Sequence, residues 1–252
     1  MNWLHAVFLG LIQGITEFIP VSSSAHLKIF KTFLGLSTGE EMVLFDLFCH
    51  LGTLLALIIY FRKDILEFFF YPRRLIPVVV ALTPLVPFYF LLKPVREALS
   101  KPEYLGFCLI GTAAILYGAS LLQKKIKARM TIKDALWIGT FQGIALIPGI
   151  SRSAATIGAG LWRGATPTEA VRFSFLLSLP AVSGGTFLEL LKAKSHLASM
   201  SFSLPHCLIG FATAAIVGLL AVRFAIPLLQ KGVLRPFAGY CLIAGILLSL
   251  YL

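Results

Sequence analysis

The chain has 252 residues, of which 58% are hydrophobic and only 13% carry a charge, and its mean hydropathy is +0.89. This composition is too apolar for a soluble domain of this length and predicts a protein that is embedded in lipid. The formal net charge of +11 could suit a nucleic-acid-binding protein, but the basic residues occupy short loops between apolar stretches, so we expect no nucleic-acid partner.

Six apolar stretches are long enough to cross a bilayer as helices, which takes about 20 residues each. In chain order these predicted spans are residues 43–61, 75–92, 105–122, 173–191, 204–224 and 237–252. Three connecting loops carry most of the basic residues, and the positive-inside rule places these loops in the cytoplasm. Because successive spans alternate in direction, both termini and the less basic loops 93–101 and 192–203 are then expected outside. The basic residues are Arg62, Lys63, Arg73 and Arg74, then Lys124, Lys125, Lys127, Arg129 and Lys133, and finally Arg223, Lys231 and Arg235.

Two related polar segments interrupt the apolar sequence, QGITEFIPVSSSA at residues 13–25 and QGIALIPGISRSA at residues 142–154. They have equal length, begin with Q-G-I, end with S-x-S-A and lie about half the chain apart. Each is flanked by two helix-like stretches that are too short to cross a bilayer. Pro20 in the first copy, and Pro148 followed by Gly149 in the second, break the helix between those stretches.

This pattern predicts two helical hairpins that each enter and leave the membrane on the same side. Irregular backbone at membrane depth needs protein or water around it, so we expect both hairpins inside the bundle. Three spans follow each hairpin, and an odd number inverts the second half relative to the first. The predicted fold is one all-α polytopic membrane domain, residues 1–252, with six transmembrane helices and two re-entrant hairpins in inverted repeats of about 1–125 and 126–252.

In this arrangement the first hairpin enters from outside and the second from the cytoplasm, so that their tips meet near the membrane midplane. Glu17 and Arg152 would lie in these tips, where a charged side chain costs about 2.5–3.5 kcal/mol on insertion scales. One explanation is a structural ion pair that only offsets its own desolvation. The other is that the two charges belong to a functional site.

Serine residues just ahead of the second helix of each hairpin favour a functional site. A single serine is often a helix N-cap, but five at related positions exceed what capping requires. Helix N-termini bind anions through free N–H groups, and the planar guanidinium of Arg152 suits phosphate or diphosphate. The predicted phosphate ligands are Ser22, Ser23 and Ser24 in the first copy and Ser151 and Ser153 in the second.

Further polar residues adjoin the first tip. His26 follows Ser23 by three residues and is either a proton carrier at a phosphoryl group or a satisfied core residue. Gln13 precedes Glu17 by one helical turn, so both side chains face the same way and could bind a metal-bound phosphate or a serine hydroxyl.

Asp46 and His50 lie four residues apart on one face of the first predicted span. They either line the same cavity or form a simple intrahelical hydrogen bond.

The segments QGITEFIPVSSSAH and PGISRSAATIGAG resemble the two signature motifs of the bacterial undecaprenyl-diphosphate phosphatase family, also called the bacitracin-resistance proteins. The resemblance extends through FDLFCHLGTLLA and FSFLLSLPA to the whole chain. It implies hydrolysis of undecaprenyl diphosphate to undecaprenyl phosphate and inorganic phosphate, which recycles the lipid carrier for cell-wall synthesis. It also implies a bacterial plasma-membrane location, a site open to the outer, periplasmic side and a divalent cation, Mg²⁺ or Ca²⁺.

The family's motif positions map onto this chain residue by residue. Its acidic-or-Gln position falls on Gln13, its Glu on Glu17, its serine on Ser23, its histidine on His26 and its arginine on Arg152. Many members have Glu where this chain has Gln13, which leaves one carboxylate for a metal that usually takes one or two.

The resulting hypothesis divides the roles between the copies. Arg152, Ser151 and Ser153 hold the diphosphate, Ser23 is a nucleophile or phosphate ligand, and Glu17 is a base or metal ligand. His26 carries the proton or, as an alternative, is itself the nucleophile. A lipid-phosphate transporter or flippase, and a bundle whose polar tips only stabilise packing, are the alternative functions. The oligomeric state stays open, with a homodimer as one option.

Overall fold

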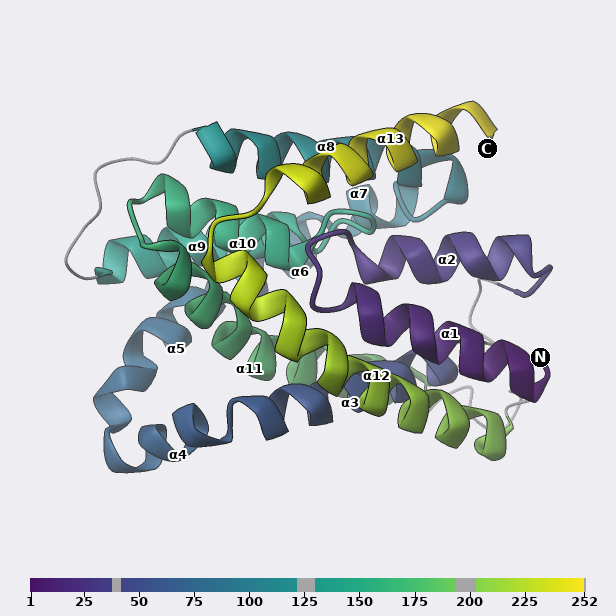
Figure 1. Ribbon diagram of the computed structural model, residues 1–252, viewed down its shortest axis with the longest axis horizontal. Helices are drawn as coiled ribbons and strands as arrows, with labels where there is room; N and C mark the ends of the chain where they lie inside the picture. The colour runs from purple at the N-terminus through teal and green to yellow at the C-terminus, as the bar shows by residue number, and fades with distance from the viewer. Residues whose placement is uncertain (38–41, 122–129, 194–202, 252) are drawn as a thin grey trace.

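The computed structural model describes residues 1–37, 42–121, 130–193 and 203–251, and in these ranges the regular secondary structure is entirely helical (Figure 1). The first half contains α1 (Trp3–Thr16), α2 (Ser23–Phe33), α3 (Val43–Tyr60), α4 (Arg62–Phe70), η2 (Pro72–Leu75), α5 (Ile76–Leu82), α6 (Leu85–Leu91), α7 (Lys93–Ala98) and α8 (Pro102–Leu121). The second half contains α9 (Ile132–Ile144), α10 (Arg152–Trp162), α11 (Pro167–Ala193), α12 (Leu204–Gln230) and α13 (Arg235–Tyr251).

Five helical stretches in the described residues are long and apolar enough to cross a membrane. They match the first five predicted spans and comprise Val43–Tyr60, Pro72–Leu91, Pro102–Leu121, Pro167–Lys192 and Leu204–Gln230. The sixth predicted span corresponds to α13, which has 17 residues and is one of the shorter apolar helices.

The outer faces of these helices are apolar. Phe224 on α12 and Leu250 on α13 are 77% and 78% exposed, as expected for side chains whose solvent is lipid. Together with the apolar spans, this makes the chain a multi-pass membrane protein.

The second predicted span is not one continuous helix. Pro84 has no N–H to donate, so the helix is interrupted between Leu82 and Leu85 and is divided into α5 and α6. The predicted loop 93–101 contains helix α7, and α4 occupies most of the first basic loop. The basic cluster at 124–129 and most of loop 192–203 lie outside the described residues.

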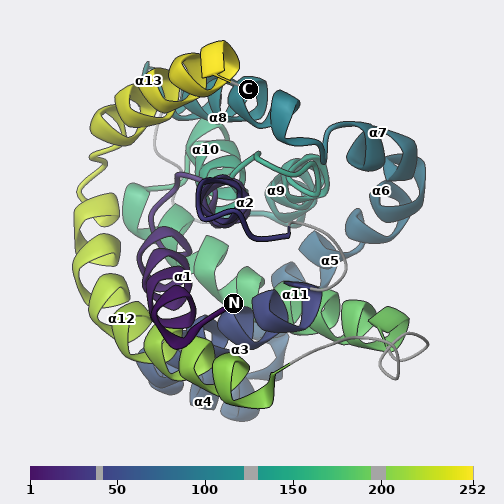
Figure 2. The same cartoon turned by 90° about the vertical axis from the view of Figure 1, so that its right-hand side faces the viewer.

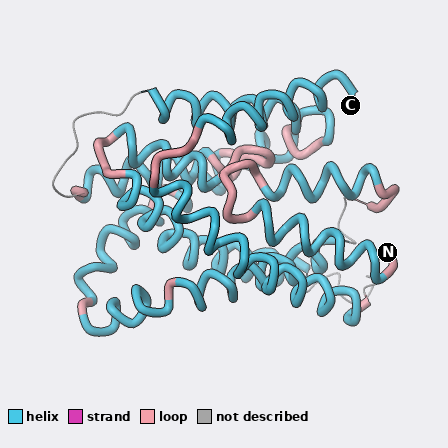
Figure 3. Tube along the Cα trace, viewed as in Figure 1, coloured by secondary structure: helices cyan, strands magenta, loops and turns pink. Residues whose placement is uncertain are grey.

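Two short hairpins occupy the middle of the bundle, as predicted. Residues 17–22 connect α1 to α2 and residues 145–151 connect α9 to α10, so both breaks fall at the predicted prolines. Figure 2 shows α2, α9 and α10 inside a ring of helices that includes α8, α13, α12 and α3 and, beside α9, the short α5 and α6, and Figure 3 shows both connecting turns near the centre. In Figure 1 the open ends of the two hairpins point to opposite ends of the molecule.

Close packing on α12 fixes the first hairpin. A Cβ added to Gly10 would lie 2.8 Å from the carbonyl oxygen of Gly210, and one added to Gly14 would lie 2.9 Å from the backbone nitrogen of Gly218. Small residues at such crossings allow two membrane helices to approach closely. The backbone of α1 is therefore held against α12, and the residues that follow it are positioned at the centre of the bundle.

Candidate active site

The two hairpin turns face one cavity with a volume of about 770 Å³. Its polar end is formed by both turns and by α3, and its walls continue along α6 and α11. Seven of the nine predicted site residues line it: Glu17, Ser22, Ser23, Ser24, Ser151, Arg152 and Ser153. The prediction that the two tips converge is therefore confirmed.

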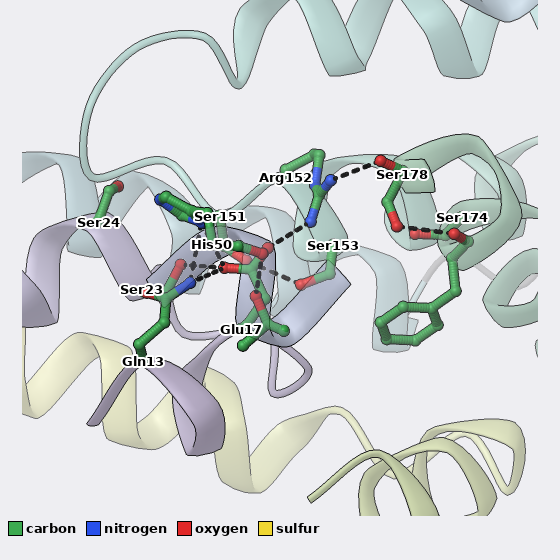
Figure 4. Close-up of polar contacts among 12 residues, drawn as sticks. Gln13, Glu17, Ser23, Ser24, His50, Ser151, Arg152, Ser153, Ser174 and Ser178 are labelled. Carbon is green, nitrogen blue, oxygen red and sulfur yellow. Dashed lines mark hydrogen bonds and ion pairs between the residues drawn. The ribbon is translucent and has the colours of Figure 1, made fainter. Parts of the chain in front are cut away.

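Glu17 connects the two tips through its carboxylate (Figure 4). Its Oε1 accepts a hydrogen bond of 2.7 Å from a terminal guanidinium nitrogen of Arg152, and its Oε2 accepts one of 2.6 Å from the Ser23 hydroxyl. The Glu17 side chain is only 8% exposed, whereas that of Arg152 is 22% exposed in the cavity. The ion pair considered at the sequence level is thus present, but it lies in the wall of a cavity and includes a hydroxyl.

Gln13 supports this carboxylate from behind. Its Nε2 donates to Glu17 Oε2 at 3.0 Å and also lies 2.9 Å from Nδ1 of His50. Because the amide nitrogen is a donor, Nδ1 of His50 accepts, and the ring proton is on Nε2. Gln13 is fully buried and does not line the cavity, whereas His50 does.

His50 is therefore a histidine of this site. Of the two alternatives given for it, lining the cavity or forming an intrahelical hydrogen bond, the first is correct. Its Nδ1 lies 3.7 Å from Glu17 Oε2, and its side chain is 28% exposed. Helical spacing could not decide this at the sequence level, because a position on α3 faces either the cavity or a neighbouring helix.

Asp46, one turn earlier on α3, has a different environment. Both of its carboxylate oxygens lie 2.6 Å from the buried ammonium of Lys31 on α2. This ion pair joins α2 to α3 outside the cavity wall.

His26 is not where the sequence-level hypothesis requires it. Its Nδ1 donates to the carbonyl oxygen of Ser22 at 2.8 Å, and its Nε2 lies 2.7 Å from the hydroxyl of Tyr240 on α13. The ring stacks on that of Tyr240 and is 5% exposed. One ring nitrogen is bonded to the backbone of the first tip and the other to α13, and His26 is not among the residues that line the cavity, so the expectation that its ring faces the cavity is corrected.

The serines differ in what they do for the helix ends. Ser151 is an N-cap, since its hydroxyl accepts from the backbone N–H of Ala154 at 3.3 Å and lies 3.1 Å from the Ser153 hydroxyl. Ser22 precedes α2 but makes no capping bond, and its φ of 70° is in the left-handed region. Such a conformation in a non-glycine residue is costly and is typical of functional sites. Capping therefore accounts for Ser151 but not for Ser22.

The second tip is held by α8. The hydroxyl of Thr112 lies 3.2 Å from the carbonyl oxygens of both Cys108 and Gly149, to either of which it can donate, and it accepts from the backbone N–H of Ser151 at 3.0 Å. Gly149 has a φ of +93°, and a Cβ there would lie 2.5 Å from the Cβ of Cys108. Both constraints require glycine, so this turn has one conformation, with the N-terminus of α10 at the cavity.

The cavity becomes apolar away from the tips. Its walls include Leu85, Val86 and Phe90 from α6, and Pro180 and Leu188 from α11. Arg96 and Glu189 also line the cavity. A ligand with a polar head and a long apolar tail matches this gradient.

A divalent cation in this site would need oxygen atoms of the bound substrate in addition to those of the protein. Within the described residues, no cluster of three or more His, Cys, Asp or Glu side chains could hold a metal ion. At the tips the carboxylate is that of Glu17, and the unpartnered Oε1 of Gln13 is buried outside the cavity wall. Since Mg²⁺ is commonly held by one or two carboxylates together with substrate phosphates, Glu17 fits a cation that shares phosphate oxygens.

Comparison with known proteins agrees with the two motifs. The family model of the bacitracin resistance protein BacA matches residues 6–247. An undecaprenyl-diphosphatase of Protochlamydia amoebophila is 39% identical over 254 residues, covering 100% of this chain and 99% of that protein. An undecaprenyl-diphosphatase of Thermodesulfovibrio yellowstonii is 40% identical over 240 residues, covering 93% and 91%. The chain belongs to the bacitracin resistance protein BacA family.

Proposed function

We propose that this protein hydrolyses undecaprenyl diphosphate to undecaprenyl phosphate and inorganic phosphate in the bacterial plasma membrane, and thereby recycles the lipid carrier of cell-wall synthesis. Its full-length relatives are named undecaprenyl-diphosphatase. The observation that carries the proposal is the carboxylate of Glu17, bonded to the hydroxyl of Ser23 on one side and to the guanidinium of Arg152 on the other.

We further propose six membrane crossings, with α13 as the last, and two re-entrant hairpins in inverted repeats. The packing of α1 and α3 on α12 has counterparts in the packing of α9 and α11 on α5, which supports the repeat. The opposite directions of the two hairpins in Figure 1 support the inversion. Arg96 of α7 and Glu189 of α11 line the cavity, and in Figure 1 α7 lies on the side of the molecule that carries both termini, which supports a site open to the outer side.

The second tip binds the diphosphate in this proposal. Arg152 exchanges its bond with Glu17 for the terminal phosphate, and the hydroxyls of Ser151 and Ser153 and the N-terminus of α10 add donors. The prenyl chain lies along the apolar walls of α6 and α11 and continues into the bilayer.

The first tip carries out the chemistry. Oγ of Ser23 attacks the terminal phosphorus while Glu17 accepts the hydroxyl proton, and the bond from that phosphorus to the bridging oxygen breaks, so that undecaprenyl phosphate leaves with the bond electrons. Water then hydrolyses the phosphoserine and releases inorganic phosphate. His50, 3.7 Å from Glu17, is positioned to take the proton from the carboxyl group before the second step.

Glu17 would also be the protein ligand of a Mg²⁺ or Ca²⁺ ion that binds together with the diphosphate. When bound, such an ion neutralises negative charge on the phosphate oxygens. His26 has a positioning role here, because its bond to the Ser22 carbonyl fixes the residue that precedes Ser23.

A phosphate-release assay in detergent tests the proposal. Purified protein should release inorganic phosphate from undecaprenyl diphosphate, and acid quenching during turnover should trap phosphate on Ser23. The Ser23→Ala variant should lose both signals. Release of inorganic phosphate without any trapped phosphoserine would contradict the attack by Ser23 and would indicate that water attacks the terminal phosphorus directly.

A lipid-phosphate transporter is the alternative that the broken helices and the repeat suggest. In detergent there is no second compartment, so a transporter would bind the lipid without releasing phosphate. Turnover in detergent therefore separates the two functions.

A further inference from the structure

Gln142 is a buried polar side chain that the proposed mechanism does not use. It lies in the last turn of α9, is 2% exposed and lines the cavity. In the described part of the chain neither its Oε1 nor its Nε2 has a hydrogen-bond partner. Gln13, at the equivalent position of the first hairpin, instead donates to Glu17 and His50.

An unpaired buried amide is unfavourable, and native structures keep few of them. The cavity-lining residues that follow Gln142 most closely in the sequence, Ala145, Leu146 and Ile150, offer no polar side chain. An orphaned amide directed into a cavity therefore indicates a partner that the protein itself does not supply. In a site for diphosphates, that partner is a ligand oxygen.

The position of Gln142 selects one of the two phosphates. A Cβ added to its neighbour Gly143 would lie 2.7 Å from the ring of Phe88 on α6, so this turn of α9 packs closely against the helix that forms part of the apolar wall. Glu17, Ser23 and Arg152 are clustered where the two tips meet. Gln142 therefore lines the cavity from a helix that packs against the α6 wall, which would hold the prenyl chain.

We propose that Gln142 binds the phosphate that stays attached to the prenyl chain, with Nε2 donating to one of its non-bridging oxygens and Oε1 accepting from a water. This inference rests on the proposed hydrolase function. It makes Gln142 a specificity determinant that recognises the phosphate retained in the lipid product, while Arg152 and the serines hold the phosphate that is released.

Product inhibition can distinguish these two phosphate positions. We would compare Gln142→Leu with the wild type in detergent, using farnesyl diphosphate as substrate and farnesyl phosphate and inorganic phosphate as inhibitors. Thr140→Val, two residues earlier on α9, is the matched control, because its hydroxyl bonds to the carbonyl oxygen of Leu136 and it does not line the cavity.

Gln142→Leu should lower kcat/KM by about 10- to 100-fold and raise the inhibition constant of farnesyl phosphate by about tenfold. The inhibition constant of inorganic phosphate should stay unchanged. The thermal midpoint of the ligand-free protein should stay the same or rise, because the leucine removes an unpaired amide. Thr140→Val should match the wild type in all four measurements.

Unchanged kcat/KM in Gln142→Leu would overturn the inference and leave the hydrolase function intact. So would a lower thermal midpoint together with equal weakening of both inhibitors, which indicates a structural role. If the wild type released no phosphate, the proposed function would fail instead. Stabilisation by inorganic pyrophosphate would then decide: a smaller thermal shift in Gln142→Leu than in the wild type supports Gln142 as a phosphate ligand, and equal shifts overturn it.

Discussion

The two hairpin tips have the same backbone plan but different side chains. Each places the N-terminus of a short helix at the cavity, yet the first has Glu17 and Ser23 where the second has Leu146 and Arg152. The repeat supplies a frame with two helix N-termini, the kind of helix end that favours anions. Two exchanged residues give one copy a carboxylate beside a hydroxyl and the other a guanidinium, so the copies can divide catalysis and phosphate binding between them.

The tips also differ in how they are held. Tyr240 on α13, in the second half of the chain, fixes His26 and through it the backbone before the first tip's Ser23. Thr112 on α8, in the first half, holds the turn before Arg152. Each tip is therefore supported by the last helix of the opposite half, and the two halves depend on each other for a working site.

Removing the first tip's carboxylate should have the largest effect. Glu17→Gln keeps the size of the side chain but cannot accept the Ser23 proton, so we expect kcat to fall by about 10³-fold. Phosphate release from undecaprenyl diphosphate in detergent measures this. Retention of more than a tenth of the wild-type kcat would show that Glu17 is not the base.

Weakening the second tip should have the next largest effect. Arg152→Lys keeps the charge but loses the planar fork of donors, and we expect a fall in kcat/KM of about 100-fold, mainly through KM. Steady-state kinetics over a range of substrate concentrations shows how much of the loss is in KM and how much is in kcat. A loss confined to kcat would contradict a phosphate-binding role.

Giving the second tip a carboxylate should not make the tips equivalent. Leu146→Glu places a second anion in the cavity wall, where it competes with phosphate for Arg152, and we expect KM to rise by about tenfold. In a Glu17→Ala background the same change should restore no turnover, because Ser23 bonds to Glu17 from the first tip. Restored turnover would mean that either tip can supply the base.

Loosening the supports should have the smallest effects, with different signatures. Tyr240→Phe removes the hydroxyl that pairs with His26 and should lower kcat about threefold at constant KM.

Thr112→Val releases the second tip and should raise KM about threefold at constant kcat. If the two variants gave the same signature, the supports would not act on separate tips.

Much of this arrangement could be predicted from the sequence. The repeated segments, their prolines and their spacing indicated two short hairpins with converging tips, and the residue types named Glu17, Ser23 and Arg152. Helical periodicity could not decide which histidine faces the cavity. His26 is turned away by Tyr240, a partner 214 residues along the chain, and no local pattern indicates that contact.

Other features depended on tertiary packing in the same way. The burial of Gln13 depends on the packing of α1 against α12 and α3, and the amide of Gln142 is seen to lack partners only once the fold is known. The division of the second span at Pro84 could have been predicted, because proline cannot donate the hydrogen bond that continues a helix. A hydropathy average over the whole span does not reveal this interruption.

The most direct test of the divided site measures binding and turnover on the same variants. Equilibrium binding of inorganic pyrophosphate and phosphate release from undecaprenyl diphosphate would be compared for Glu17→Gln and Arg152→Ala, with circular dichroism confirming that both fold. We predict that Glu17→Gln loses turnover but binds pyrophosphate within about threefold of the wild type, whereas Arg152→Ala binds at least about 30-fold more weakly. Normal pyrophosphate binding by Arg152→Ala, or full turnover by Glu17→Gln, would contradict the division of roles between the tips.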